Sequence, residues 1–282
     1  MTEGARPNTA GRPGSALPDG APERDQPERD QHEHEHRIGA TVDLHCHILP
    51  GIDDGARDME DAVAMACQAE ADGIWAICAT PHIRHDHDVR IAELHNRRAE
   101  LNDAIRAAGC STRVLAGAEV AATAADGLDD AELLAVALGD GHRWILLEPA
   151  PGPLDDGLDA VVHGLHERGY RALIAHPERH PAGDLIPRLA GLIAEGALVQ
   201  VTADYLVQQN TREGMLALAR AGVVHVLASD SHSSRGGRPV AISPALGVLG
   251  SVIPPAQLDW IAYTAPEAIA GGAALTLPFQ LP

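Results

Sequence analysis

Short apolar segments alternate along the chain with longer amphipathic ones, and this alternation most constrains the fold. Seven apolar segments have the length of buried strands, and four of the intervening segments have helical spacing and close on a glycine. Strand and helix in alternation predict a parallel α/β sheet, and seven consecutive units predict closure into a barrel. The expected strands cover residues 40–45, 73–80, 112–119, 143–149, 171–176, 197–202 and 223–230, and the expected helices cover residues 58–73, 90–109, 155–169 and 210–222.

The chain is expected to contain one folded domain preceded by a tail. Residues 1–37 are rich in Pro, Gly and charged residues and hold few large apolar side chains. Such a segment buries too little apolar surface to offset the entropy lost on ordering, so we expect it to be disordered. Residues 38–282 are enough for a single barrel domain with a sizeable core.

Charge and composition exclude several classes of partner and location. The formal net charge of -19 argues against binding to phosphate backbones, and only seven aromatic residues are present to stack on bases, so no nucleic-acid partner is expected. The four cysteines form no C-x-x-C pair, which argues against a disulfide framework or a zinc ribbon. No apolar run approaches the roughly 20 residues of a transmembrane segment. We therefore expect a soluble, cytoplasmic protein.

Polar residues with metal-ligand chemistry stand at or just after the carboxyl ends of nearly all expected strands. In a barrel these ends share one face, where such folds place their chemistry. One histidine at a strand end is more often a surface or hydrogen-bonded core residue, but a whole set on one rim favours a site. His-x-His strengthens this, because alternate residues of a strand point to the same side. The set comprises His45, His47, His82, Glu119, Glu148, His176, Asp230 and His232.

Six sequence fragments occur in the order and spacing of a known family. They are DLHCHILPGIDDGA, ATPHI, GAEV, LLEP, AHPER and ASDSH, and the likeness covers roughly residues 41–271. On these fragments the chain resembles the polymerase and histidinol phosphatase (PHP) superfamily, and within it the bacterial manganese-dependent protein-tyrosine phosphatases. The resemblance implies a distorted (β/α)7 barrel of the PHP type that holds three divalent ions.

The resemblance also implies which residues hold each ion. Asp54 joins the set by its position in the family motif. Many other branches of the superfamily carry a histidine there, and an acid favours the tyrosine-phosphatase branch. By position, His45, His47, Glu119 and Asp230 would hold one ion; Glu119, Glu148 and His176 a second; and Asp54, His82 and His232 the third.

The chemistry of this set agrees with the resemblance. Five imidazoles and four carboxylates without a thiolate suit manganese, iron or zinc, with manganese expected. Three divalent ions against four carboxylates leave about two positive charges, which would attract a phosphate dianion. The resemblance further implies that Arg179 and Arg238 bind substrate phosphate, which a guanidinium can grip at two oxygens. Arg235 is a rival to Arg238.

A thiol mechanism is the chemical alternative at this stage. The segment CATPHIR, from Cys78 to Arg84, satisfies the C-x5-R spacing of cysteine-dependent tyrosine phosphatases. Pro81 removes one backbone donor, however, and the loop has no glycine to let the backbone approach a phosphate. Burial of Cys78 in an apolar strand would also raise its pKa. Cys46 should point to the opposite side of its strand from His45 and His47.

The expected function is that of a metal-dependent phosphatase acting on protein phosphotyrosine. The resemblance implies, as its partner, the tyrosine-rich tail of a bacterial kinase that regulates exopolysaccharide or capsule synthesis. Two alternatives stay open: a small-molecule phosphomonoesterase, such as a histidinol-phosphate or nucleotide phosphatase, and a metal-loaded module that binds phosphorylated partners without turnover. The family usually has a second histidine where Ile83 stands and an Asn-containing run where residues 233–237 stand, and these departures could shift substrate preference.

Overall fold

The computed structural model describes Met1, residues 41–180 and residues 182–276. Contacts divide the chain into Met1–Ile38 and Gly39–Pro282, and the description below concerns the second unit. Apart from Met1, the predicted disordered tail over residues 1–37 lies outside the described residues.

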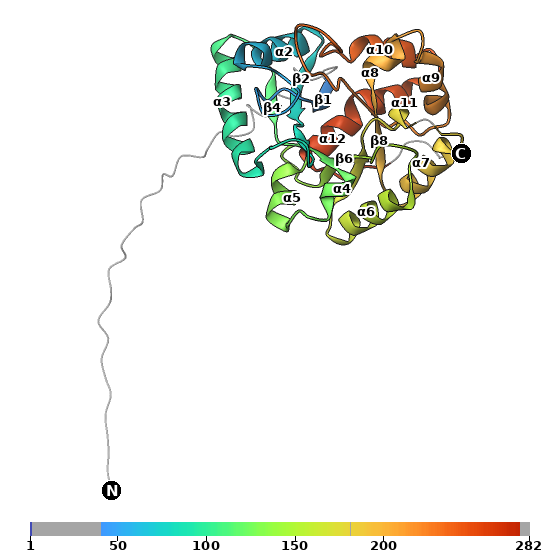
Figure 1. The fold of residues 1–282 in the computed structure, drawn as a ribbon, viewed down its shortest axis with the longest axis horizontal. Helices are drawn as coiled ribbons and strands as arrows, with labels where there is room; N and C mark the ends of the chain where they lie inside the picture. Colours follow the sequence, from blue (N-terminus) through green and yellow to red (C-terminus); the bar gives the residue numbers. More distant parts are fainter. Residues whose placement is uncertain (2–40, 181, 277–282) are drawn as a thin grey trace. The chain divides into compact units, whose positions relative to one another are not determined.

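Two parallel sheets, which together form a curled layer, lie at the centre of this mixed α/β fold (Figure 1). Every strand pair is parallel, as predicted from the alternation of strands and helices. One sheet has the order β1 (Thr41–Cys46), β2 (Ile74–Ala79) and β4 (Arg113–Leu115). The other has the order β3 (His82–Ile83), β5 (Glu119–Ala121), β6 (Trp144–Glu148), β7 (Arg171–Ile174), β8 (Leu198–Thr202) and β9 (Val226–Ala228).

One of the seven expected strands, residues 112–119, is broken into β4 and β5, and the short strand β3 follows the expected strand over residues 73–80. At both places the chain passes from the first sheet into the second. Pro81, which has no N–H to donate to a sheet, lies between β2 and β3. Gly117 lies between β4 and β5, where a Cβ would stand 3.0 Å from the Ala79 carbonyl oxygen. The strand ends of β1 and β9 also meet, because a β-bridge joins Cys46 to Ser231.

Helices cover the outside of the sheet, and the four predicted helices are confirmed. Figure 1 shows α2, α3, α6, α7 and α9 around the central strands. The predicted helices correspond to α2 (Met59–Ala71), η1 (Ile91–Glu93) with α3 (Leu94–Ala107), α6 (Asp156–Glu167) and α9 (Arg212–Arg220). The others are α4 (Ala122–Ala125), α5 (Asp130–Val136), η2 (Pro177–Arg179), α7 (Leu185–Ala194), α8 (Ala203–Val207), α10 (Ser243–Leu249), α11 (Pro255–Asp259), η3 (Trp260–Thr264) and α12 (Ala265–Gly271).

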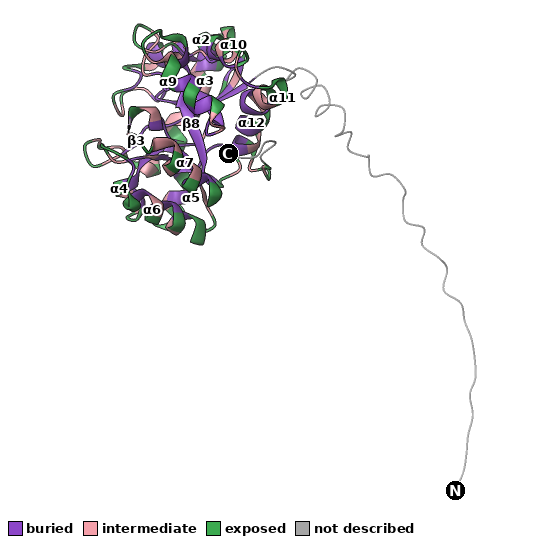
Figure 2. Cartoon of the chain, turned by 90° about the vertical axis from the view of Figure 1, so that its right-hand side faces the viewer, coloured by how far each residue is buried: buried purple, intermediate pink, exposed green. Residues whose placement is uncertain are grey.

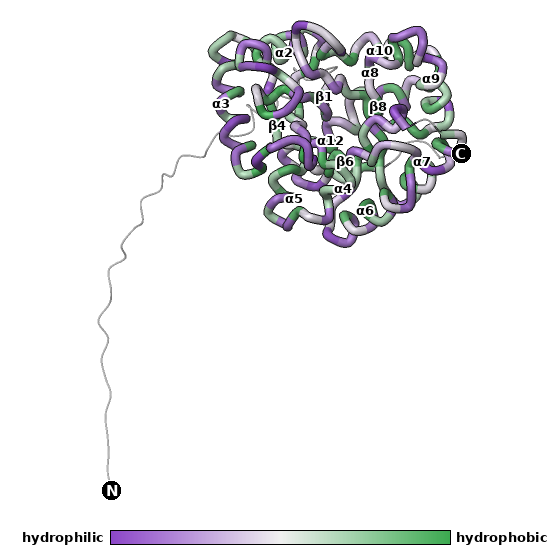
Figure 3. The backbone as a smooth tube through the Cα atoms, in the orientation of Figure 1, coloured by the Kyte–Doolittle hydropathy of each residue, from purple (hydrophilic) through white to green (hydrophobic). Residues whose placement is uncertain are grey.

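The core lies between the strands and the inner faces of the helices. Figure 2 shows buried residues along the strands and exposed residues on the outer helix faces, and Figure 3 shows hydrophobic segments toward the middle. In α6 the buried residues are Leu158, Val161, Val162 and Leu165, the spacing of an amphipathic helix. Asp155 caps the N-terminus of the same helix, because its carboxylate accepts hydrogen bonds from two backbone N–H groups of the first turn.

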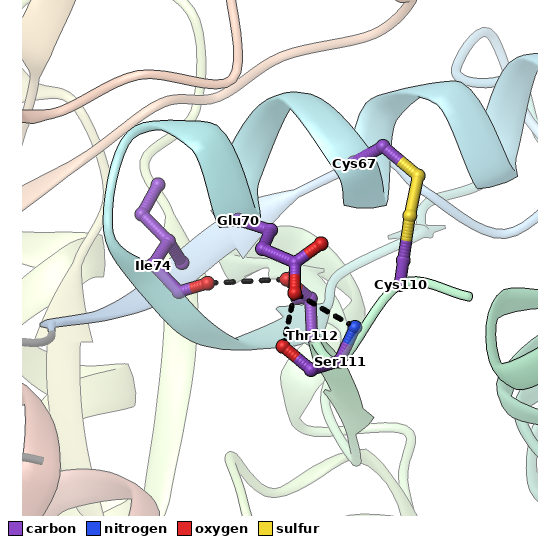
Figure 4. Close-up of a disulfide and its surroundings, with 6 residues drawn as sticks. All are labelled: Cys67, Glu70, Ile74, Cys110, Ser111 and Thr112. Atoms are coloured by element: carbon purple, nitrogen blue, oxygen red, sulfur yellow. Dashed lines mark hydrogen bonds between the residues drawn. A yellow bond between two sulfur atoms is a disulfide. The ribbon is translucent and has the colours of Figure 1, made fainter. Parts of the chain in front are cut away.

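A disulfide corrects one expectation drawn from the cysteines. Cys67 of α2 is bonded to Cys110, which follows α3, although their spacing argued against a disulfide framework. The two cysteines meet because α2 packs beside α3, a contact that 43 residues of separation do not reveal. Figure 4 shows the bond and the neighbouring Glu70, which accepts a 3.0 Å hydrogen bond from the Ser111 backbone N–H.

The length and apolarity of the helices in the described ranges bear on whether any of them could span a membrane. None of them is both long enough and apolar enough to cross a bilayer.

Candidate metal centre

The structure brings all nine predicted metal ligands together at the carboxyl ends of the strands. They form four overlapping groups, and within each group one ligand atom per residue lies within 4.8 Å of the others. The groups are His45, His47 and Asp230; His45, Glu119 and His176; His82, Glu119 and Glu148; and His47, Asp54, His82 and His232.

Glu119 is the central residue of this cluster. Its Oε1 lies 2.7 Å from Nε2 of His176, and its Oε2 lies 2.9 Å from Nδ1 of His82. The same Oε2 lies 3.4 Å from Nε2 of both His45 and His47. One carboxylate therefore faces four imidazoles, the arrangement expected of a ligand shared between ions.

Two strand ends adopt an unusual backbone conformation that directs ligands into the cluster. His176 has φ of 30° and Asp230 has φ of 49°, both in the left-handed region that side chains other than glycine rarely adopt. Such a conformation costs about 1–3 kcal/mol per residue and persists where the surroundings impose it, often at functional sites. The Asp230 N–H is held by the His45 carbonyl oxygen at 2.8 Å.

Buried atoms in the cluster fit a divalent cation. Glu119 Oε2 and His82 Nδ1 are both buried and make no well-aligned hydrogen bond, although they lie 2.9 Å apart. Unpaired polar atoms are costly in a protein interior, and a cation between them would satisfy both. Imidazole nitrogens and carboxylate oxygens are also the donors that manganese, iron and zinc accept.

The grouping differs from that implied by the sequence resemblance, because Glu119 is not in the group of His45, His47 and Asp230, and His47 also joins Asp54, His82 and His232. Glu148 and His176 were expected to share one ion with Glu119, but the structure places them in separate groups. His82 joins Glu119 and Glu148 instead, because β3 pairs with β5 and aligns His82 with Glu119. His82 also remains beside Asp54, at 3.5 Å, as predicted.

Asp53 orients two of the histidines and was not predicted. Its Oδ2 accepts hydrogen bonds from Nδ1–H of His47, at 2.8 Å, and from the backbone N–H of His82, at 3.2 Å. Its Oδ1 accepts from the backbone N–H of Gly55 at 3.0 Å. A Cβ at Gly55 would stand 2.1 Å from the His47 carbonyl oxygen, so this turn requires glycine. The aspartate thereby leaves Nε2 of His47 facing the cluster.

Gln200 has the same role for His45 and was also missed. Its Oε1 lies 2.9 Å from Nδ1 of His45, which directs Nε2 of that imidazole toward the cluster. Gln200 is fully buried in β8. A glutamine inside the apolar segment ALVQVT was the available signal, since buried polar side chains require partners.

The cluster sets the pKa values of its histidines in opposite directions. Burial alone would lower the pKa of His47, but Asp53 and Glu119 outweigh it and raise the pKa to about 9. Burial lowers the pKa of His176 to about 3 and that of His232 to about 4. Burial opposes ionisation of Glu119, but the neighbouring histidines hold its pKa well below the usual value.

These pKa values predict that binding of a divalent cation releases a proton. At pH 7 His47 is protonated when no cation is bound, because its pKa is about 9, whereas His176 and His232 are neutral. A ligating imidazole must be neutral, so binding should release about one proton, and affinity should rise with pH up to about 9. Titration calorimetry in buffers of different ionisation enthalpy measures this release. A proton count of zero would contradict the assignment of His47.

Both predicted arginines reach the cluster at Asp230. Arg179 pairs with Oδ2 of Asp230, and Nη2 of Arg238 lies 3.2 Å from the same oxygen. The rival Arg235 points elsewhere, with Nη2 at 3.4 Å from Glu60. The structure therefore favours Arg238 over Arg235 as a residue of the site.

The loop that carries Arg238 is fastened to α2. The buried carboxylate of Asp61 accepts hydrogen bonds from the hydroxyl groups of Ser233 and Ser234 and from the backbone N–H of Ser234. The departure from the family at residues 233–237 therefore includes two serines that hold this loop in place.

The thiol alternative finds no support at Cys78. Its side chain is fully buried in β2, and burial raises the pKa of the thiol far above neutrality. Cys46 is also fully buried, and burial raises its pKa as well. Neither thiol can supply an exposed thiolate nucleophile.

Comparisons with known proteins place the chain in a family. Residues 41–269 match the family described as capsular polysaccharide synthesis, CpsB/CapC. The tyrosine-protein phosphatase YwqE of Bacillus subtilis is 32% identical over 199 residues, which cover 68% of this chain and 77% of that protein. The putative tyrosine-protein phosphatase CapC of Staphylococcus aureus is 29% identical over the same shares of the two chains.

Solved structures agree with the sequence comparison. A chain from a crystallographic study of YwqE from Bacillus subtilis and CpsB from Streptococcus pneumoniae, described there as metal-dependent tyrosine phosphatases, superposes with a TM-score of 0.72 at 28% identity. The match covers 85% of this chain and 98% of that one. A phosphotriesterase homology protein from Escherichia coli is similar in fold alone, with a TM-score of 0.53 at 13% identity. The chain therefore belongs to the CpsB/CapC family of capsular polysaccharide synthesis proteins.

Proposed function

We propose that this protein is a metal-dependent phosphatase that hydrolyses phosphotyrosine in proteins. The observation that carries the proposal is the cluster of nine imidazole and carboxylate side chains, with two arginines at its edge. The tyrosine-phosphatase names of YwqE and CapC, and the metal dependence of the similar solved structure, support it.

The finer assignments are part of the same proposal. The protein is a PHP-type distorted (β/α)7 barrel, supported by seven strand positions if the pairs β2/β3 and β4/β5 are each counted once. It binds three divalent ions, manganese in the cell, through the nine residues. It acts in the cytoplasm on the tyrosine-rich tail of a kinase that regulates exopolysaccharide synthesis, which fits the family of capsular polysaccharide proteins.

Different residues of the chain have different roles in the proposed hydrolysis. Divalent cations bound by such a set polarise phosphoryl oxygens and lower the pKa of water. Arg179 and Arg238, 30% and 24% exposed, are accessible to a phosphate and can each grip two of its oxygens. Asp53 and Gln200 hold His47 and His45 in the tautomers that present Nε2. The phenol of tyrosine has a pKa of about 10, so its departure needs less help from a general acid than departure of an alkoxide.

Removal of metal tests the proposal against the thiol mechanism. We expect chelation to abolish hydrolysis of p-nitrophenyl phosphate and of a phosphotyrosine peptide, and added manganese to restore it. Cys78→Ser should change activity little, because the thiol is fully buried and burial raises its pKa. Activity that survives chelation but disappears in Cys78→Ser would refute the metal mechanism. A panel containing histidinol phosphate and nucleotides separates this function from that of a small-molecule phosphatase.

Arg179→Ala should weaken catalysis without removing metal. The guanidinium pairs with Asp230 from outside the histidine cluster, so its loss removes a phosphate contact and leaves the ligands in place. We expect kcat/KM on phosphotyrosine peptide to fall by about 10- to 100-fold, the effect of losing a hydrogen bond to a charged group. Ion counting by mass spectrometry checks the metal. Arg106→Ala, which removes an exposed arginine paired with Asp103, serves as control.

A further inference from the structure

A further arginine contacts a different ligand of the cluster from the one that Arg179 and Arg238 contact. Arg84 follows β3 directly, and its Nη1 lies 3.2 Å from both carboxylate oxygens of Glu148. Glu148 belongs to the group with His82 and Glu119, whereas Arg179 and Arg238 contact Asp230. Arginines therefore contact the cluster at two different ligands.

The loop after β3 fixes the position of this guanidinium. Nε of Arg84 lies 2.7 Å from Oδ1 of Asp86, and Nη2 lies 3.3 Å from Nε2 of His87. The His87 ring in turn stacks on His82, with 4.8 Å between ring centroids. Arg84 is thus braced by its own loop. Its side chain is 28% exposed, close to the 30% of Arg179, so a substrate can reach it.

The charges around Arg84 bear on whether its guanidinium can bind the phosphate of a substrate. A guanidinium beside bound divalent cations is repelled by them unless anions lie between. Glu148 and Asp86 both face Arg84, so the charge of the guanidinium is already balanced, and the surplus is that of the whole cluster, where three divalent ions would exceed the four carboxylates by two charges. The surplus positive charge favours an incoming dianion. Nη1 of Arg84 alone donates to both carboxylate oxygens of Glu148, and the Nη1–Nη2 edge of a guanidinium, turned toward a phosphate, can donate to two phosphate oxygens.

We propose that Arg84 is a further phosphate-binding residue, which contacts the phosphate of the substrate beside Glu148, whereas Arg179 and Arg238 would contact it beside Asp230. The inference rests on the proposed function, because it assigns a contact to the phosphate ester of that reaction. It also gives a role to the arginine of the C-x5-R spacing in a mechanism that does not use Cys78.

The test measures binding of inorganic phosphate to the manganese-loaded protein by calorimetry, with bound ions counted in each variant. We expect Arg84→Met to keep the ion count and to bind phosphate about tenfold more weakly, the loss expected for a charge-assisted hydrogen bond. Arg84→Lys should recover only part of this loss, because an ammonium cannot grip two oxygens in a fork. Arg90→Met, which removes an exposed arginine paired with Glu93, should bind phosphate like the wild type.

Three outcomes would overturn the role of Arg84. Phosphate affinity in Arg84→Met within twofold of wild type would show that the arginine does not contact phosphate. Loss of bound ions would assign Arg84 to positioning of Glu148 alone. An equal loss of phosphate affinity in Arg90→Met would show that the effect of Arg84→Met comes only from the change in net charge. Turnover of phosphotyrosine peptide by the wild type is measured in parallel. Phosphate binding without turnover would refute the proposed function while the binding comparison still decides the role of Arg84.

Discussion

Glu119→Gln should reduce hydrolysis of phosphotyrosine by about a thousandfold or more, because bound divalent cations supply several kcal/mol of transition-state stabilisation. Glu119 faces His45, His47, His82 and His176 with its two oxygens. The amide removes the negative charge and one of the two acceptor oxygens, so both groups that contain Glu119 lose a ligand. Bound ions, counted by mass spectrometry after gel filtration, should fall together with kcat/KM.

Glu178→Gln is the matched control for this change. Glu178 is a partly buried glutamate, which accepts a 2.8 Å hydrogen bond from the Thr202 backbone N–H, and it belongs to none of the four ligand groups. Burial raises its pKa, so a neutral amide is a mild replacement. The control should keep its ions. If Glu119→Gln also kept all its ions and its activity, the central carboxylate would have no role in metal binding.

Asp53→Asn should weaken metal binding by about 10- to 100-fold, the usual effect of removing a residue that orients a ligand. Asp53 accepts three hydrogen bonds, from His47, His82 and Gly55, and an asparagine keeps only one acceptor oxygen. If the amide nitrogen faces His47, the imidazole must accept at Nδ1 and carry its proton on Nε2. That tautomer cannot bind an ion at Nε2.

Titration of the chelated protein with manganese measures the effect of Asp53→Asn. Asp126→Asn changes an aspartate at the end of α4 and should bind manganese like the wild type. Equal manganese affinity in Asp53→Asn and wild type would show that the hydrogen bond to His47 does not matter for the ion.

Local patterns were sufficient to predict the elements that carry the site. The apolar segments and the glycines that close the helices located the strands, and parallel strands place their carboxyl ends on one side. For this reason residues as distant as His45 and His232 could be predicted to converge. The interruption at Pro81 follows from a local signal, because proline has no N–H to donate, whereas the break at Gly117 depends on how closely a neighbouring strand passes, which no local pattern contains.

Contacts between distant segments account for what the sequence did not reveal. The Cys67–Cys110 bond depends on the packing of α2 against α3. The hydrogen bond from His45 to Gln200 depends on two strands facing one another across 155 residues of sequence. The place of His82 beside Glu119 and Glu148 depends on the register of β3 and β5.

Anomalous diffraction from manganese-loaded crystals tests the central claim most directly, namely that the nine side chains form a metal site. The account predicts manganese peaks inside the cluster, with one about 2.1 Å from ligand atoms of His45, His47 and Asp230, and with Glu119 as a shared ligand. Crystals that contain manganese only outside the cluster, with no peak between His45, Glu119 and Asp230, would contradict the account.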